Sequence, residues 1–223
     1  MYRIEGVVTG MIGTNCYTLI NEETKEAIFI DASGNTETLT RVVKNENLTP
    51  KAILLTHAHF DHMDGVEGIR EEFPDIEVII GENDAPLLED PISNLSLAFT
   101  GNPISTKADR TVSDGEEISL IGLTIKCIEV PGHTIGGICY YIDNQINKGD
   151  NGDILTKTGV IFDGDTLFWA SIGRSDFPTG DEETLLRNIR EKLFVLPEDT
   201  LVLPGHNNKT SIKWEKKNNP YFN

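Results

Sequence analysis

The first third of the chain combines alternating apolar and polar positions with stretches of apolar residues at helical spacing. Residues 2–9 alternate β-forming and polar side chains, which is typical of a half-buried strand. Further strands are predicted at residues 15–21, 26–31, 52–56 and 76–80, and helices at residues 35–45 and 63–72. Strands that alternate with helices indicate parallel pairing, so this part predicts a mixed sheet.

The rest of the chain consists mainly of short apolar runs separated by turns. A turn is predicted at Asp114 and Gly115, and a hairpin about Gly122. Strands are predicted at residues 117–120, 123–130, 138–142, 160–162 and 200–203. Apolar residues along one side of residues 182–193 predict an amphipathic helix, and a shorter helix is predicted at residues 83–89.

Two polar segments interrupt this pattern. Pro91–Ala108 is rich in Pro, Asn, Ser, Gly and Thr around Leu95, Leu97 and Phe99. A loop of this length in a compact domain is usually functional or disordered, so we expect it to cover a site. Asp143–Thr158 is rich in Gly, Asn and Asp, and we interpret it as the exposed tip of a hairpin.

Potential metal ligands gather directly after the apolar run 52–56. The chain contains 5 histidines, and three of them lie within the six positions 57–62. Because side chains alternate along a strand, His57 and His59 are expected to point the same way, with Asp61 and His62 just beyond. Imidazole and carboxylate groups together are the donor set of Zn²⁺ or another borderline metal.

The same arrangement recurs later in the chain, where His133, Asp165 and His206 each follow an apolar run. A glycine lies close to each group and allows a tight turn or a close approach of the backbone. The sequence therefore predicts one strand-end face with seven candidate metal ligands: His57, His59, Asp61, His62, His133, Asp165 and His206. Asp31 ends another apolar run, where it could cap the helix at 35–45 or support a metal ligand from behind.

Composition restricts the class of protein. The 223 residues fit one domain, residues 1–223, with 38% hydrophobic residues to build its core. No apolar run approaches the roughly 20 residues of a membrane span, and the N-terminus lacks a secretory signal. A complete chain of this kind is expected in the cytoplasm. The odd number of cysteines, 3, predicts buried or free thiols: Cys16, Cys127 and Cys139.

The charge of the chain bears on its partners. The formal net charge is −17, from 19 basic and 36 acidic residues, and a field of this sign repels nucleic acid and anionic membranes. We therefore expect a small-molecule substrate, no nucleic acid and no membrane, while the sequence does not indicate an oligomeric state. A lysine cluster near the C-terminus is either a solvated helix face or an anion-binding patch: Lys209, Lys213, Lys216 and Lys217.

The motifs THAHFDH, PGHT, GDTLF and PGH resemble those of the metallo-β-lactamase superfamily. The segment GDTLFWASIGRSDFPTG resembles the glyoxalase II-like branch, whose members include hydroxyacylglutathione hydrolases. The resemblance covers nearly the whole chain. It implies an α/β fold of the αβ/βα type, a four-layer sandwich in which helices flank two mixed sheets and metals bind at one edge.

The resemblance also implies a ligand set. One metal would be held by His57, His59 and His133 and a second by Asp61, His62 and His206, while Asp165 would bridge the two. Zinc is the expected metal, with iron or manganese as alternatives, and Asp31 would be the supporting carboxylate. Asp61 and Asp165 would carry the catalytic carboxylate roles.

The implied chemistry is hydrolysis of a thioester or ester. Coordination lowers the pKa of water to roughly 7, so a metal-bound hydroxide attacks the carbonyl and a metal stabilises the oxyanion. A thiolate leaving group needs little proton help, since the pKa of a thiol is about 8.5.

Two features differ from full-length glyoxalase II enzymes. Those enzymes carry a helical C-terminal domain, whereas this sequence ends seventeen residues after His206. Arg174 lies where they place a basic substrate residue, but it could instead form a structural ion pair with Asp176.

Three functions therefore remain open at this point. The first is a dinuclear metal hydrolase, the second is a mononuclear iron persulfide dioxygenase with a similar motif, and the third is a metal-binding protein without turnover. The persulfide dioxygenase would use His57, His133 and Asp165 for one iron and leave the other candidates empty. A periplasmic β-lactamase is disfavoured by the missing signal and by the positions of the cysteines.

Overall fold

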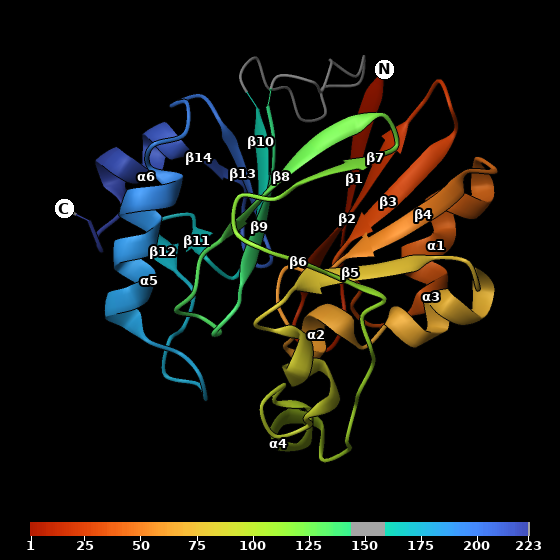
Figure 1. Ribbon diagram of the computed structural model, residues 1–223, viewed down its shortest axis with the longest axis horizontal. Coiled ribbons are helices and arrows are strands. Elements are labelled where there is room, and N and C mark those ends of the chain that lie inside the picture. Colours follow the sequence, from red (N-terminus) through yellow and green to blue (C-terminus); the bar gives the residue numbers. More distant parts are fainter. Residues whose placement is uncertain (144–158, 223) are drawn as a thin grey trace.

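Two mixed sheets packed face to face form the centre of the protein, with helices on the outer sides (Figure 1). The structure is a computed structural model that describes residues 1–143 and 159–222. The expected hairpin tip at Asp143–Thr158 lies outside the described residues except for Asp143. The predicted α/β sandwich of two mixed sheets and flanking helices is confirmed.

The first sheet has six strands in sequence order: β1 (Tyr2–Thr9), β2 (Thr14–Asn21), β3 (Glu26–Ile30), β4 (Thr49–Leu54), β5 (Glu77–Gly81) and β6 (Arg110–Val112). The strands β1, β2 and β3 pair antiparallel, and β3 to β6 pair parallel. The parallel pairing predicted from alternating strands and helices is therefore confirmed.

The second sheet has the order β14-β13-β10-β9-β8-β7. Its strands are β7 (Glu117–Leu120), β8 (Leu123–Glu129), β9 (Ile138–Ile142), β10 (Val160–Gly164), β13 (Leu201–Pro204) and β14 (Thr210–Ser211). A small hairpin of β11 (Leu167–Phe168) and β12 (Ser171–Ile172) follows β10. The strands β10 and β13 pair parallel, so both end at the same edge of the sheet.

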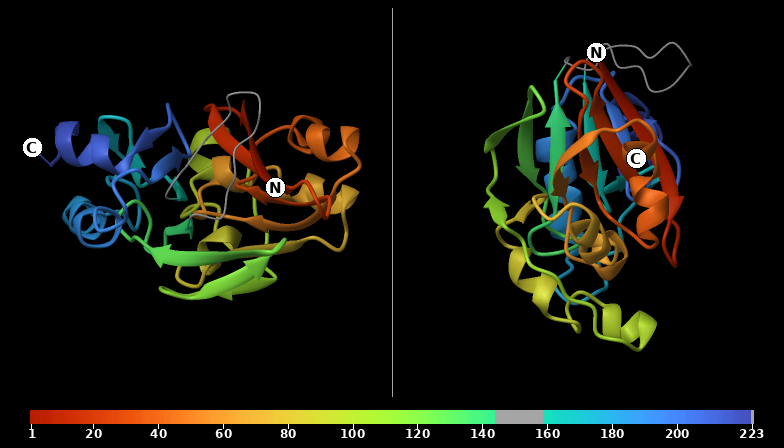
Figure 2. Two further views of the ribbon diagram at one scale, coloured as in Figure 1. Left: turned by 90° about the horizontal axis from the view of Figure 1, so that it is seen from above. Right: turned by 90° about the vertical axis from the view of Figure 1, so that its right-hand side faces the viewer.

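Helices cover the outer faces of both sheets (Figures 1 and 2). α1 (Thr36–Asn45) and α3 (Val66–Glu72) pack on the first sheet, and α5 (Glu182–Asn188), η2 (Ile189–Leu193) and α6 (Ile212–Asn218) pack on the second. Three short helices, α2 (Phe60–Met63), η1 (Ala85–Glu89) and α4 (Ser96–Thr100), lie between β4 and β6 in the chain. Within the described residues, no helix has the length and hydropathy needed to cross a membrane.

Strand alternation explains how the layers meet. Along β8, Leu123, Ile125 and Cys127 are buried between the sheets, while Thr124 and Lys126 are exposed. Burying a large aliphatic side chain contributes about 1.5–3 kcal/mol, so such rows hold the two sheets together. All three cysteines are buried and free, as predicted.

The helix predicted at residues 63–72 differs from the structure, which contains α2 and α3 with a break at Asp64 and Gly65. Tertiary contacts cause the break. The Gly65 N–H donates to Ala32 O at 2.8 Å, and Asp64 Oδ1 accepts from the Gly34 N–H at 2.6 Å. A Cβ at Gly65 would lie 2.8 Å from Leu39 Cδ1 and 3.1 Å from Ala32 O, so a larger residue would push against α1 and the loop after β3.

Candidate metal centre

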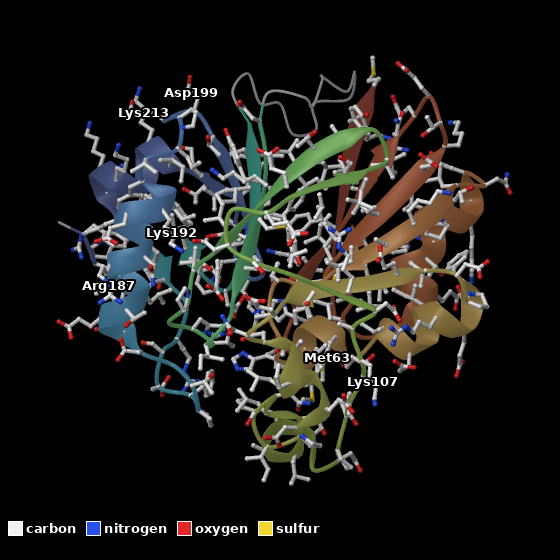
Figure 3. The ribbon with its side chains drawn as sticks, viewed as in Figure 1. Met63, Lys107, Arg187, Lys192, Asp199 and Lys213 are labelled. Carbon is white, nitrogen blue, oxygen red and sulfur yellow. The ribbon has the colours of Figure 1, made fainter. Side chains whose placement is uncertain are left out.

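His57 and His59 lie in the loop between β4 and α2. The strand ends at Leu54, so the two side chains do not alternate along a strand as predicted. They nevertheless enter the same cluster, with ring centroids 4.7 Å apart and planes at 87°. Their convergence follows from the loop that leads into α2, a short helix whose last residue, Met63, is labelled in Figure 3.

The other candidate ligands come from four further positions. Asp61 and His62 are on α2, His133 is in the turn after β8, Asp165 follows β10, and His206 follows β13. The structure brings all seven candidates together in overlapping groups whose ligand atoms lie within 4.8 Å of one another. Six are less than one-eighth exposed, and the His206 side chain is 18% exposed.

The first group contains three histidines from two loops. His59 Nδ1 lies 2.9 Å from His133 Nε2, and His133 Nε2 lies 3.2 Å from His57 Nε2. These three nitrogens therefore surround one point between the loop after β4 and the turn after β8.

The second group joins α2 to the loop after β13. Asp61 Oδ2 lies 3.2 Å from His206 Nε2 and 3.4 Å from His62 Nε2. Asp165 lies between the groups, with Oδ1 3.4 Å from His62 Nε2. Its other oxygen, Oδ2, is 3.6 Å from His206 Nε2 and 3.7 Å from His133 Nε2.

Hydrogen bonds on the outer side of the cluster assign the tautomers of three histidines. The Nδ1–H of His62 donates to Asp31 Oδ2 at 2.8 Å, and that of His133 donates to the carbonyl oxygen of Arg174 at 2.6 Å. The Thr56 hydroxyl donates to Asp31 and accepts from His57 Nδ1 at 3.1 Å. Each ring therefore turns an Nε2 lone pair inward.

Inward lone pairs need a cation between them. His57 Nε2 and His133 Nε2 face each other at 3.2 Å, and neither carries a proton once Nδ1 has donated. His62 Nε2 and Asp165 Oδ1 are buried without a hydrogen-bond partner in the described part of the chain. Nitrogen and carboxylate donors in this arrangement fit a divalent metal such as zinc or iron.

Electrostatics set the charges of the donors, and a metal ion bound at His62 Nε2 would displace the proton that the raised pKa of this ring favours. Burial lowers the pKa of His59 to about 3 and that of His57 well below its usual value, so both rings are neutral. Burial would also lower the pKa of His62, but Asp31, Asp61 and Asp165 raise it above its usual value. Against burial, His62 holds the pKa of Asp165 below the ordinary range of a carboxyl.

Asp31 does not cap α1. The cap is Asn35, whose side chain accepts from the Thr38 N–H at 3.0 Å, so that alternative is wrong. Asp31 instead accepts from the Thr56 N–H at 2.8 Å and holds His62. Its φ of 57° places it in the left-handed region, which a non-glycine residue adopts only when its surroundings fix it.

Sequence reasoning missed Asp84, a buried carboxylate that ties two ligand-bearing loops together. Its Oδ2 accepts from the Ala58 N–H at 3.0 Å and from the Thr134 hydroxyl at 2.8 Å. Its Oδ1 accepts from the Gly136 N–H at 2.7 Å. Asp84 follows the apolar strand β5, so the pattern that identified the ligands could have identified it.

Two further contacts support ligands and were also missed. Thr56, directly before His57, links that histidine to Asp31. The Thr14 hydroxyl donates to Asp61 Oδ2 at 3.0 Å from the start of β2, 47 positions away in the chain. No local pattern indicates the second contact, because it depends on the packing of α2 against the start of β2.

Gly205 lets the second group close around Asp165. A Cβ at this position would lie 2.5 Å from Asp165 Oδ1 and 2.5 Å from His62 Cε1. Any side chain here would displace a candidate ligand, which explains the glycine before His206.

Arg174 lies at the rim of a cavity of about 260 Å³ above the cluster. Its Nε and Nη2 donate to the two carboxylate oxygens of Asp176 at 2.9 and 2.8 Å. The ion pair considered as an alternative is therefore present, while contact with a substrate remains a prediction. The segment Pro91–Ala108 also reaches this cavity through Leu95 and Phe99, as expected, although it contains the helix α4.

Comparison with known proteins agrees with this geometry. Residues 10–145 match the family model described as the metallo-beta-lactamase superfamily. The probable metallo-hydrolase YqgX of Bacillus subtilis is 35% identical over 96% of this chain and 94% of its own. The hydroxyacylglutathione hydrolase GloC of Haemophilus influenzae is 35% identical over 99% of this chain and 98% of its own.

Solved structures agree as well. The crystal structure of the BLEG-1 B3 metallo-beta-lactamase has a TM-score of 0.88 and 37% identity, covering 99% of both chains. The di-iron-bound form of TTHA1623 has a TM-score of 0.78 and 30% identity, covering 97% of this chain and 99% of the other.

Proposed function

This chain belongs to the metallo-beta-lactamase superfamily, and we propose that it is a metal-dependent hydrolase of thioesters or esters. The observation that carries the proposal is the convergence of nitrogen and carboxylate donors on one buried space: His57 Nε2 and His133 Nε2 lie 3.2 Å apart, and His62 Nε2 is buried without a hydrogen-bond partner in the described part of the chain. Further support comes from the similarity to metallo-hydrolases and to a hydroxyacylglutathione hydrolase over nearly the whole chain.

Two metal ions are proposed, because the candidate ligands include two groups, and Asp165 lies within 3.7 Å of a histidine of each. His57, His59 and His133 would hold one ion, and Asp61, His62 and His206 the other. Zinc is the proposed metal, and similarity to a di-iron protein keeps iron as the alternative. Bound metal supplies Lewis acidity and lowers the pKa of water to roughly 7.

The residues of the chain itself position the donors and the substrate. Asp31, Thr56 and the carbonyl of Arg174 fix the rings of three histidines, so these rings do not need to turn when a substrate binds. Asp61 remains ionised, because His62 and the hydrogen bond from His206 keep its pKa low despite burial. The cavity over the cluster, about 260 Å³, has room for the carbonyl group of a substrate beside the candidate ligands.

Assays on metal-loaded protein test this proposal. We expect close to two metal ions per chain by elemental analysis, and a lower content with no hydrolysis in His59→Ala. Zinc-loaded protein should hydrolyse S-lactoylglutathione or a simple acyl thioester without oxygen. Native protein without tightly bound metal would contradict the proposal.

Two other activities are measured with the same preparation. The persulfide dioxygenase alternative predicts oxygen uptake by iron-loaded protein given glutathione persulfide. Oxygen uptake without thioester cleavage by either metal form would overturn the hydrolase proposal. A chromogenic cephalosporin is the third substrate, because the BLEG-1 B3 metallo-beta-lactamase is 37% identical to this chain. If only the cephalosporin is cleaved, the proposed substrate class changes from thioesters to β-lactams.

A further inference from the structure

The cavity above the candidate ligands has a polar floor and mainly apolar walls. Five candidate ligands form the floor: His59, Asp61, His133, Asp165 and His206. Six apolar side chains form the walls: Ile12, Phe60, Leu95, Phe99, Phe168 and Phe177. A group attached to a carbonyl on the floor would therefore lie against apolar side chains.

Aromatic rings connect the rim of the cavity to its floor. The ring centroids of Phe60 and Phe99 are 5.7 Å apart, and those of Phe99 and Phe177 are 6.1 Å apart. Phe177 in turn lies 5.6 Å from His59, edge to face. These separations fall in the range of about 4.5–7 Å in which aromatic pairs attract, so the rings form one continuous wall.

Two wall residues are exposed on different elements. Ile12, in the turn between β1 and β2, is 46% exposed, and Phe99 on α4 is 45% exposed. A single exposed apolar residue is ordinary on a protein surface. Two that border one cavity, together with an aromatic wall, form the kind of apolar surface that binds a ligand.

The walls of the cavity offer little positive charge to an anionic group. Arg174 is the only Lys or Arg side chain among the described residues that line it. Both of its bonding nitrogens donate to Asp176, and its guanidinium lies 4.1 Å from the centroid of Phe177. Asp176 already offsets the charge of Arg174, so a substrate carboxylate would compete with Asp176 for this guanidinium, whereas an apolar group would not.

We propose that the substrate of this site carries an apolar acyl group, aromatic or medium-length aliphatic, which lies against Phe99 and Phe177. The inference rests on the proposed hydrolase function and adds to it the chemical class of the acyl group. Recognition comes from burial of apolar surface, because the cavity walls offer few polar groups to an acyl chain.

The test is a series of thioesters with one neutral thiol, N-acetylcysteamine, and the acyl groups acetyl, butyryl, hexanoyl, benzoyl and lactoyl. For metal-loaded wild type, kcat/KM should rise by about fourfold for each added methylene from acetyl to hexanoyl. Phe99→Ala should lower kcat/KM for hexanoyl by about tenfold and leave that for acetyl within about twofold. Phe99→Leu should restore most of the preference.

Leu97 provides a matched control, because it lies on the same helix and is 46% exposed but does not line the cavity. Leu97→Ala should keep the wild-type preference. A wild type that prefers acetyl or lactoyl groups would overturn the inference while leaving the hydrolase function intact. Equal losses for acetyl and hexanoyl in Phe99→Ala would also overturn it, since they indicate a structural role.

Binding of uncleavable thioethers gives a readout that needs no turnover. Isothermal titration should give S-hexyl-N-acetylcysteamine a lower Kd than the S-ethyl compound, and Phe99→Ala should remove the difference. If no thioester is cleaved but the hexyl compound still binds more tightly, the hydrolase function fails and the apolar subsite stands. Equal affinity for both thioethers would refute the apolar subsite.

Discussion

Asp31 and Asp165 both contact His62, but they meet opposite nitrogens of its ring. Asp31 Oδ2 lies 2.8 Å from Nδ1, where it accepts a hydrogen bond from the Nδ1–H, and Asp165 Oδ1 lies 3.4 Å from Nε2 without a hydrogen bond. The first carboxylate therefore orients the ring from behind. Asp165, in contrast, lies among the ligand nitrogens. Alanine substitution of Asp31 and of Asp165 should therefore reduce activity to different extents.

Asp165→Ala should abolish most hydrolysis and lower the bound metal, because it removes the carboxylate that lies beside histidines of both groups. Asp31→Ala should cost only about 10–100-fold in activity or metal affinity, as is usual for a supporting partner. Elemental analysis and kcat/KM of the two variants measure this difference. Equal, mild losses would argue against a bridging position for Asp165.

Asp84 makes stability depend on pH. Burial raises its pKa to about 6, although three hydrogen bonds oppose the shift. The folded protein binds the proton of Asp84 more tightly than the unfolded chain does. This proton binding therefore stabilises the fold fully below about pH 4, and the stabilisation is lost as the pH rises through 6.

The Asp84→Asn variant isolates this effect, since the amide does not titrate. The free energy of unfolding of wild type minus that of Asp84→Asn should fall by about 3 kcal/mol between pH 4 and pH 7. Urea unfolding at a series of pH values measures it. The matched control is Asp75→Asn, which makes the same change of residue type at an exposed site. A constant difference for Asp84→Asn would contradict the raised pKa.

At the scale of elements, the sequence predicts most strands and the positions of the ligands between them. Apolar periodicity fixes the strands, and polar residues directly after them mark the edge where the ligands gather. The break at Gly65 and the helix α4 could not be predicted in this way. Both depend on contacts with distant parts of the chain, such as the Gly65 N–H to Ala32 O bond at 2.8 Å.

Partners of the ligands were also harder to predict than the ligands themselves. The His133 ring is held by the main-chain carbonyl of Arg174, 41 positions away. Every residue has such a carbonyl, so the sequence does not indicate which one contacts His133. The apolar walls of the cavity come from the β1–β2 turn, from α2, from α4 with the residue before it, from β11 and from the segment after β12. No local pattern shows that these segments border one cavity.

At the scale of the whole molecule, the candidate metal centre joins the two sheets. Four ligands follow β4 of the first sheet, and three follow β8, β10 and β13 of the second. The Tyr140 hydroxyl on β9 also crosses between the sheets and donates to Leu55 O at 2.9 Å. Metal binding therefore contributes to the association of the two halves, and not only to the reaction.

Metal removal should lower the thermal stability of the whole protein. Free metal at 1,000 times its Kd stabilises a folded protein by about 4 kcal/mol. A chelator should therefore lower the midpoint of thermal unfolding by roughly 10 °C. His57→Ala, which lacks one ligand, should respond less to the chelator. An unchanged midpoint in wild-type protein shown by elemental analysis to contain metal would contradict the role of metal in joining the halves.

The hydrogen bonds behind His57, His62 and His133 have a consequence for the choice of metal. A hydroxyl, a carboxylate and a carbonyl group of the protein hold these three rings so that one nitrogen of each points inward. The protein itself therefore sets the direction of these donors. A site of nitrogen and carboxylate donors binds several divalent first-row metal ions. Their intrinsic affinities for such a site follow the Irving–Williams order. We therefore expect the bound metal to depend on which ions are available in the cell. Protein purified from cells grown with different metals should have the same fold but contain different metal ions.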